Sequence, residues 1–488
     1  MAPLQTAATR SARVREHLGH PVVDGDGHVI ELIPVFADFV RDHGRSDIVE
    51  GAAIFNMGET FSRGQREMSP TDKRRAALVP AGWNHPTDTE YFATVTTPSR
   101  YYERLGETGI DFAVLYPTIG LPLSQIEDEE QRVVLCRLYN EFMAEQYRPY
   151  GDRFTMAATI PMHSPDDAID AMVHAKNLGA KVALIPSYVR RPRPGESWAD
   201  DQWNRVRPSG FGFRGWLDTF GLDSEHDYDS VWAKAIELGL PLAVHSAGMG
   251  FSDRQSISNF AYNGIGHFAA AGAALAKSLF FGGVTRRFPQ LRVAVLEGGV
   301  AVGVEIYVRL VSFWQKRGAG LDKLNPANVD RDLLATLFAE SDPRLTRYPV
   351  AELVAQLGSP QNRRDDFAAT GVQSEEDIRD QFCRAFYWGC ETDDPLVGIA
   401  FDRRITPLGA RVPAIMGSDI GHWDVPEFDS PLAEAYELLE HGILDADELR
   451  DYLFTHSVQL YGSLNPNFFV GTTIEREAAS VLQQHPFV

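Results

Sequence analysis

The sequence predicts an α/β protein built as a closed (β/α)8 barrel, and three observations support this fold class. Short apolar runs alternate with helix-like segments along the chain, as they do in βα units of a parallel sheet. Eight such runs can be counted, which is the number that a barrel of this type needs. No glycine-rich GxGxxG turn follows any of them, so the runner-up, an open doubly wound sheet, has no dinucleotide-binding motif to support it.

The elements follow in order along the chain. The eight predicted strands are residues 21–27, 112–117, 156–161, 181–186, 241–246, 292–298, 385–392 and 414–420. The helices predicted between them are residues 131–146, 165–178, 228–238 and 268–287, and two more are predicted at 431–439 and 445–455. We expect a flexible N-terminal arm over residues 1–19, one barrel domain over 20–470 and a looser tail over 471–488.

Three connections are too long to be simple loops. They are residues 31–100 after the first strand, 187–227 after the fourth and 321–382 before the seventh. The first two leave the carboxyl ends of strands, where barrel enzymes build their active sites, so we expect them to form lids or substrate-binding walls. The third is highly charged and is expected to be a surface or subunit-contact excursion.

Composition narrows the class of protein. The 488 residues carry a net charge of −21, which argues against nucleic acid as the main partner and against binding to an acidic membrane surface. No stretch approaches the roughly 18 apolar residues that would span a bilayer. The three cysteines form no CxxC pair, so a reducing, cytoplasmic location is expected. The excess of acidic residues is interpreted as general solubility of a cytosolic enzyme.

Polar side chains stand at the ends of four predicted strands. They are Asp26 and His28 on the first strand, His245 on the fifth, Glu297 on the sixth and Asp419 on the eighth. Such groups are costly to bury unless a charge holds them. Because strands of a barrel end on one face, these side chains can meet there. Two histidines with two carboxylates form a site for one divalent metal, first of all Zn²⁺, with Mn²⁺ or another first-row metal as alternatives.

Each of these residues also has a structural explanation when it is taken alone. Asp26 and His28 can be a polar strand end in contact with solvent, and His245 can be a satisfied core histidine. Asp419 can cap the turn that follows its strand. It is their joint occurrence at one face of a barrel that favours a metal site.

Several motifs occur in a fixed order between residues 20 and 465. They are Val23-Asp24-Gly25-Asp26-Gly27-His28, Gly109-Ile110-Asp111, Tyr139-Asn140-Glu141, Pro241-Leu242-Ala243-Val244-His245, Phe288-Pro289-Gln290-Leu291-Arg292-Val293 and Gly417-Ser418-Asp419 with His422. In these motifs the chain resembles the amidohydrolase-related family, in the branch that contains aminocarboxymuconate-semialdehyde decarboxylase, resorcylate-type decarboxylases and metal-dependent C–C hydrolases. The resemblance implies a (β/α)8 barrel with one metal held by Asp26, His28, His245 and Asp419.

Two positions depart from the family pattern. The first-strand motif is often His-x-His in the family, and here its first member is Asp26. Decarboxylases of the family usually place a general acid/base histidine on the sixth strand, where this chain has Glu297. Glu297 can be a third carboxylate ligand, a base for a metal-activated water or a partner that orients His245, and a structural acid is the remaining alternative.

The sequence therefore predicts a metal-dependent hydrolase of a small organic substrate such as a cyclic or aromatic carboxylate, which uses a metal-activated water. Glu297 or His422 would move the proton, while Arg190, Arg191 and His267 are candidate substrate-binding residues. The alternative is a non-oxidative, metal-dependent decarboxylase of an aromatic or dienoic acid. A third class is a non-catalytic binding protein that a metal stabilises. The family resemblance implies a homodimer.

Overall fold

The computed structural model describes residues 8–56, 68–75, 85–192, 216–245, 256–320, 322–325, 328–355 and 365–484. Parts of the predicted N-terminal arm, of the three predicted insertions and of the C-terminal tail lie outside these ranges.

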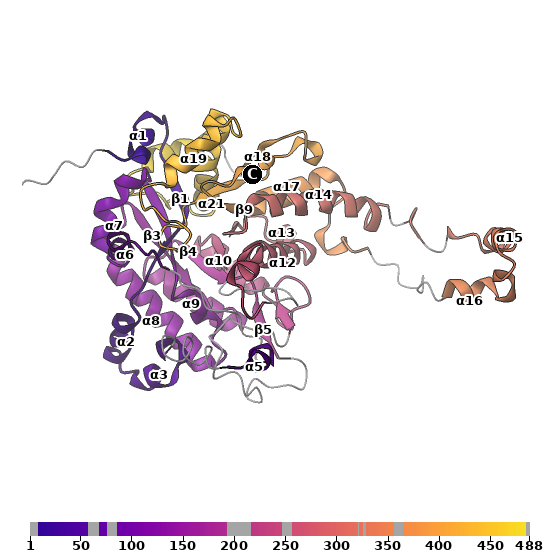
Figure 1. Ribbon diagram of the computed structural model, residues 1–488, viewed down its shortest axis with the longest axis horizontal. Coiled ribbons are helices and arrows are strands. Elements are labelled where there is room, and N and C mark those ends of the chain that lie inside the picture. Colours follow the sequence, from indigo (N-terminus) through magenta and orange to yellow (C-terminus); the bar gives the residue numbers. More distant parts are fainter. Residues whose placement is uncertain are drawn as a thin grey trace, which may run out of the picture.

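Eight parallel strands follow one another around the centre of the molecule (Figure 1). They are β1 (Val23–Val29), β2 (Phe112–Pro117), β3 (Phe154–Thr159), β4 (Val182–Pro186), β7 (Leu242–His245), β8 (Val293–Val295), β9 (Phe386–Glu391) and β10 (Ala414–Gly417). Each pairs in parallel with the next from β1 to β10. The predicted barrel is confirmed, because all eight predicted strands are present in order.

Helices cover the outside of the barrel. Those between or after barrel strands are α8 (Glu129–Tyr147), α9 (Pro165–Asn177), α10 (Asp229–Leu238), α11 (Phe260–Gly264), α12 (His267–Phe281), α13 (Val284–Arg287), α14 (Val300–Arg317), α17 (Glu375–Ala385), α18 (Gly398–Phe401), α19 (Pro431–Glu440), α20 (Ala446–Arg450) and α21 (His456–Leu464). Side chains cap several of them: Asp128 accepts a hydrogen bond from the Gln131 amide in α8, and Ser164 does the same for Asp167 in α9.

The long connections contain elements of their own. Between β1 and β2 lie α2 (Ile33–Asp42), α3 (Ser46–Gly51), α5 (Pro70–Arg75), α6 (Thr89–Val95) and α7 (Pro98–Arg104). After β4 comes an antiparallel hairpin of β5 (Val189–Arg191) and β6 (Trp216–Asp218). Before β9, α15 (Arg331–Ser341) and α16 (Val350–Ala355) lie far from the barrel, and α15 has no buried residue (Figure 1).

The barrel closes where its first strand meets its last. The Asp419 amide donates to the Asp26 carbonyl at 2.9 Å, and the His28 amide donates to the Ile420 carbonyl at 2.7 Å. Within β1 the register with β2 shifts between Asp24 and Gly27. Strict alternation along a strand would put Asp24, Asp26 and His28 on one side, and this bulge separates Asp24 from the other two.

The C-terminal segment forms part of the barrel core. Phe468 and Phe469 are buried among inward-facing strand residues such as Phe112, and Ala478 and Val481 of α22 (Glu475–Gln484) belong to the same cluster. The prediction of a looser tail after residue 470 is therefore wrong for the described part of it. Apolar side chains packed against the barrel account for this order.

The N-terminal arm also differs from the prediction over its described part. Residues Arg10–His17 form α1, which packs on α19. Ser11 is fully buried, and Arg15 forms an ion pair with Asp111 at 2.5 Å. These contacts hold the segment against the barrel, so the arm is not flexible from residue 10 onward.

One helical stretch, Phe260–Phe281, is long and apolar enough to cross a membrane by length and composition, with a mean hydropathy of 1.2. This stretch differs from the expectation that no segment of the chain is long and apolar enough to span a bilayer. Within the fold this stretch comprises α11 and α12, and α12 buries Leu275, Leu279 and Phe280 in the main core. A core helix of a barrel passes the same test of length and hydropathy, so this stretch is weak evidence for a membrane span.

Candidate metal centre

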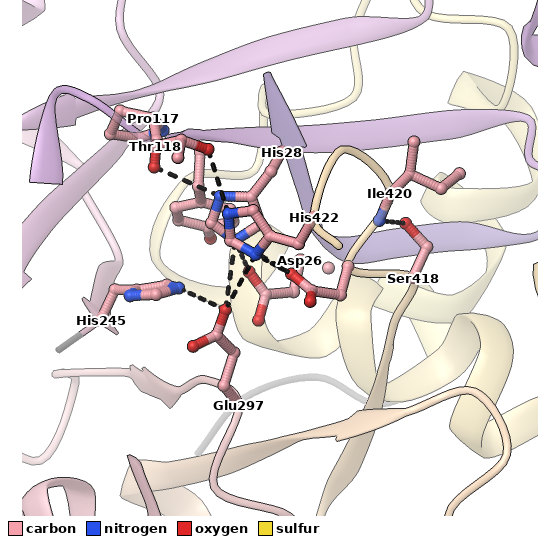
Figure 2. Close-up of polar contacts among 12 residues, drawn as sticks. Asp26, His28, Pro117, Thr118, His245, Glu297, Ser418, Ile420 and His422 are labelled. Carbon is pink, nitrogen blue, oxygen red and sulfur yellow. Dashed lines mark hydrogen bonds and ion pairs between the residues drawn. The ribbon is translucent and has the colours of Figure 1, made fainter. Parts of the chain in front are cut away.

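The predicted metal-binding residues meet at the carboxyl ends of the barrel strands (Figure 2). Asp26 and His28 lie on β1, His245 is the last residue of β7, and Asp419 lies two residues past the end of β10. Glu297 follows β8 by two residues. All five side chains are almost fully buried, with at most 6% of each exposed.

The spacing of the donor atoms fits a small cation. His28 Nε2 lies 3.4 Å from Asp26 Oδ1, 3.5 Å from Glu297 Oε1 and 3.5 Å from Asp419 Oδ1. Two ligands that each bind a tetrahedral Zn²⁺ at its usual distance are about 3.4 Å apart. His28 Nε2 and Asp26 Oδ1 are buried atoms without a close hydrogen-bond partner within the described structure. A divalent cation would satisfy them.

The candidate ligands form two overlapping groups. One contains Asp26, His28, His245 and Glu297, and the other contains His28, Glu297, Asp419 and His422. His28 and Glu297 belong to both, so a cation in either position would lie beside the Glu297 carboxylate. The sequence prediction placed Asp26, His28, His245 and Asp419 in one set. The structure brings the first three together in one group and places Asp419 with His28 in the other.

Two of the carboxylates stand on unusual backbone. Glu297 has φ 54° and Asp419 has φ 49°, both in the left-handed region that non-glycine residues seldom adopt. Such conformations cost about 1–3 kcal/mol each and persist where the surrounding structure imposes them. In this fold they occur at the first turns after β8 and β10, where the chain leaves the barrel while the carboxylates remain at its centre.

Electrostatics keep Glu297 ionised and His28 protonated before a cation binds. Burial alone would raise the pKa of Glu297, but the facing rings of His245 and His28 lower it well below its usual value. The His245 Nε2 atom lies 2.8 Å from Glu297 Oε1. Burial opposes the charge on His28, yet its interactions with Asp26 and Glu297 raise its pKa to about 10.

His422 lies against the cluster from the turn after β10. Its Nδ1 is 2.7 Å from Asp419 Oδ1, and its Nε2 is 3.0 Å from Thr118 Oγ1. The ring stacks on His28 with centroids 3.9 Å apart. Burial and the nearby charge of His28 hold the pKa of His422 well below its usual value, so this ring is neutral.

The predicted substrate-binding residues take up different positions. Arg190 pairs with Glu127 at 3.0 Å, and Arg191 pairs with Asp218 at 2.9 Å. The structure places both on the β5–β6 hairpin, and their role as a clamp for a substrate carboxylate stays a prediction. His267 begins α12 and is buried; burial lowers its pKa to about 4, and Glu297 is close enough to act on it.

Sequence reasoning did not single out two residues near this centre. Glu391 is the last residue of β9, in the same strand-end position as the predicted ligands. The residue is exposed to solvent, and the charges of Glu297, Asp424 and Asp26 act on its carboxylate. The strand-end signal that identified Glu297 applies equally to Glu391. The second residue, Glu31, has no such local signal, since its partners lie more than 80 positions away.

The arrangement therefore provides imidazole and carboxylate donors for one cation, with an ionised carboxylate beside it. A cation there polarises a bound carbonyl or lowers the pKa of water, and a neighbouring carboxylate accepts a proton.

A family model described as amidohydrolase matches residues 81–318. No curated protein matches the chain in sequence.

Solved structures share the fold at low sequence identity. The crystal structure of amidohydrolase map2389c from Mycobacterium avium subsp. paratuberculosis K-10 has a TM-score of 0.50 at 15% identity, covering 91% of this chain and 98% of that one. A 2,6-dihydroxybenzoate decarboxylase in complex with 2,6-dihydroxybenzoate has a TM-score of 0.48 at 13% identity, covering 91% and 99%. A dihydroxybenzoic acid decarboxylase from Polaromonas sp. JS666, with bound manganese and 2-nitroresorcinol, has a TM-score of 0.49 at 12% identity, covering 92% and 99%. At these identities the likeness shows the fold alone.

Proposed function

We propose that this chain is a metal-dependent enzyme of the amidohydrolase family that hydrolyses a small organic substrate, since a family model with that description matches residues 81–318. The observation that carries the choice of hydrolysis is the ionised carboxylate of Glu297 inside the ring of donor atoms. Hydrolysis needs a proton acceptor next to the reacting water, and Glu297 is suited to that role.

In this proposal Asp26, His28, His245 and Asp419 hold one divalent cation, Zn²⁺ first and Mn²⁺ second. Two imidazoles and two carboxylates suit either metal. The cation would supply Lewis acidity, which lowers the pKa of water and polarises a carbonyl.

The positions of the side chains indicate which group accepts the proton and which group returns it. Glu297 Oε1 takes a proton from the attacking water and returns it to the leaving group. In the metal-free protein Glu297 Oε1 lies 2.8 Å from His245 Nε2, so the carboxylate already faces the cluster. His422 is fixed by Asp419 and Thr118, so it borders the reacting groups in a defined orientation.

Decarboxylation of an aromatic or dienoic acid is the second candidate, and the comparisons agree with it better than with hydrolysis. The two neighbours with a named reaction described above are decarboxylases, although their likeness extends to the fold only. The observation on this chain that favours it is Glu391. A decarboxylase must protonate the carbon that loses CO₂, and Glu391, exposed at the end of β9 and near other carboxylates, is the residue that could carry that proton.

The experiment that separates the two reactions follows solvent isotopes. Purified enzyme loaded with Zn²⁺ or Mn²⁺ is incubated with hydroxylated benzoic acids, dienoic acids and their esters or ring-cleavage ketones in H₂¹⁸O and in D₂O. Hydrolysis introduces one ¹⁸O into a carboxyl product and releases no CO₂. Decarboxylation releases CO₂ and introduces deuterium at carbon, with no ¹⁸O in the organic product.

Two matched variants test the assignment of the proton carriers. Glu297→Gln abolishes hydrolysis if Glu297 is the acceptor, whereas Glu391→Gln leaves it intact. The opposite pattern, with CO₂ release lost in Glu391→Gln, would establish the second candidate. The predicted homodimer and cytoplasmic location stay predictions.

A further inference from the structure

Glu31 is a buried carboxylate just past β1, with 8% of its surface exposed. It accepts hydrogen bonds from three consecutive backbone amides in the loop after β2. The donor distances are 3.2 Å from Thr118, 2.8 Å from Ile119 and 3.2 Å from Gly120. The hydroxyl of Tyr139 donates to the same carboxylate. Four donors on one carboxylate define the path of this loop.

The loop has little freedom to take another path. A Cβ atom at Gly120 would lie 2.5 Å from the Tyr139 ring and 2.6 Å from Pro117, so the backbone passes there in close contact with both. Successive amides that point at one acceptor form a concave anion-binding turn. Here the anion is the side chain of Glu31.

The same loop touches two histidines of the metal centre (Figure 2). The Pro117 carbonyl lies 3.2 Å from His28 Nδ1, and Thr118 Oγ1 lies 3.0 Å from His422 Nε2. A carbonyl accepts and never donates, so His28 carries hydrogen on Nδ1 and directs Nε2 at Asp26, Glu297 and Asp419.

We propose that Glu31 is a positioning residue of the metal centre: it holds the 117–120 loop, and through that loop it orients His28 and His422. The inference rests on the proposed function for the role of His28 as a ligand. Hydrogen-bond partners behind a ligating histidine change metal affinity by about 10–100-fold when they are removed, and Glu31 acts one step further back.

The test is Glu31→Gln, which keeps the side-chain volume but provides one acceptor oxygen in place of two. Metal-depleted protein is titrated with Zn²⁺ against a chromophoric chelator. We expect the variant to fold, to bind Zn²⁺ about 10-fold more weakly and to lose kcat with little change in KM. Asp377→Asn is the matched control, because Asp377 also accepts two backbone amides, from Gln373 and Ser374, in a helix cap far along the chain. It should leave Zn²⁺ affinity unchanged.

Thr118→Val tests the link from loop to ring. It keeps the Glu31 bonds and removes only the hydroxyl that faces His422. We expect lower kcat with Zn²⁺ affinity retained, and a double variant with Glu31→Gln that is less than additive, since both act through one loop. If Glu31→Gln does not fold, Thr118→Val alone decides: unchanged kcat and pH profile overturn the proposal.

The failure of this inference is distinguishable from failure of the proposed function. If His28→Ala still binds Zn²⁺ like the wild type, the ligand assignment is wrong. If His28→Ala loses the metal while Glu31→Gln binds it with wild-type affinity, only the positioning role of Glu31 is wrong.

Discussion

At the scale of single residues, Glu297 and Asp419 are two carboxylates in similar backbone strain with different proposed tasks. Both have a positive φ, and both face His28 at 3.5 Å. Asp419 is held by His422 and Glu297 by His245. We propose that Asp419 binds the cation and that Glu297 accepts the proton. Substitution of Asp419 should therefore affect metal retention, and substitution of Glu297 should affect kcat.

The first prediction contrasts their amide variants. Glu297→Gln should lower kcat by about 10²–10⁴-fold, the usual contribution of a general base, while the protein keeps one metal per chain. Asp419→Asn should lose the metal during dialysis. Elemental analysis and initial rates measure both. A Glu297→Gln protein that emerges from dialysis without metal would make Glu297 a ligand instead.

The second prediction concerns pH. The pKa of His28 is about 10 in the metal-free protein, so a cation must displace a proton from it. Apparent metal affinity should therefore rise about tenfold per pH unit for each proton displaced, between pH 6 and 8. Calorimetry with Mn²⁺ in buffers of different ionisation enthalpy measures the released protons. An affinity that does not change with pH would contradict the prediction.

The same shift affects the stability of the metal-free protein. The pKa of His28 in the folded protein lies above its ordinary value of 6.5. The contribution of protonated His28 to the free energy of unfolding is therefore fully present below about pH 6.5. It is lost as pH rises through about 10.

At the scale of elements, the contact between β1 and the turn after β10 aligns Asp26 with Asp419. Asp24 is fully buried and accepts hydrogen bonds from the Ser418 amide at 2.9 Å and from the Ser418 hydroxyl at 2.6 Å. It also accepts from the Asp26 amide. One side chain thus links the strand that carries Asp26 to the turn that carries Asp419.

The third prediction is that Asp24→Ala destabilises the fold and weakens the metal centre together. Leaving the buried Ser418 donors without an acceptor should cost about 1–3 kcal/mol in the free energy of unfolding. Urea titration measures this cost, and Zn²⁺ titration measures the affinity. Asp445→Ala is the control: it removes a helix cap worth about 1 kcal/mol and should leave Zn²⁺ affinity unchanged. Equal Zn²⁺ affinity in Asp24→Ala and Asp445→Ala would contradict the proposed link between Asp24 and the metal centre.

The strands and their polar ends could be predicted from the sequence, because burial of parallel strands leaves a pattern within a few residues. His245 and Asp419 were found in this way, as was Glu297. Glu31 and Asp24 act through partners 87 and 394 positions away, respectively, and no local pattern contains such pairings. The bulge in β1 that separates Asp24 from Asp26 was invisible for the same reason.

At the scale of the whole molecule, the C-terminal segment completes the barrel core. Phe468 is fully buried, stacks with Tyr461 at 4.9 Å and contacts Phe112 of β2 at 6.2 Å between ring centroids. The Tyr461 hydroxyl reaches the Gly25 carbonyl at 3.2 Å, so this packing continues to the bulge of β1.

The fourth prediction is that Phe468→Ala lowers the free energy of unfolding by about 3–5 kcal/mol, as expected for loss of a buried aromatic ring. Chemical denaturation measures the loss. Val470→Ala, two residues away and 55% exposed, should have almost no effect. Similar stability of the two variants would show that the segment is not part of the core.

The order in which the residues are synthesised has a consequence for how the barrel is completed. A ribosome makes Asp26 and His28 long before Asp419, and it makes Phe468 later still. The emerging chain therefore has strands without their last neighbour until β10 has been made, and it lacks part of its core until Phe468 follows. Such an intermediate exposes apolar surface and is prone to aggregate. With the proposed ligands, the metal site is complete only after Asp419 has been made, so metal loading would be a late step in the maturation of this protein.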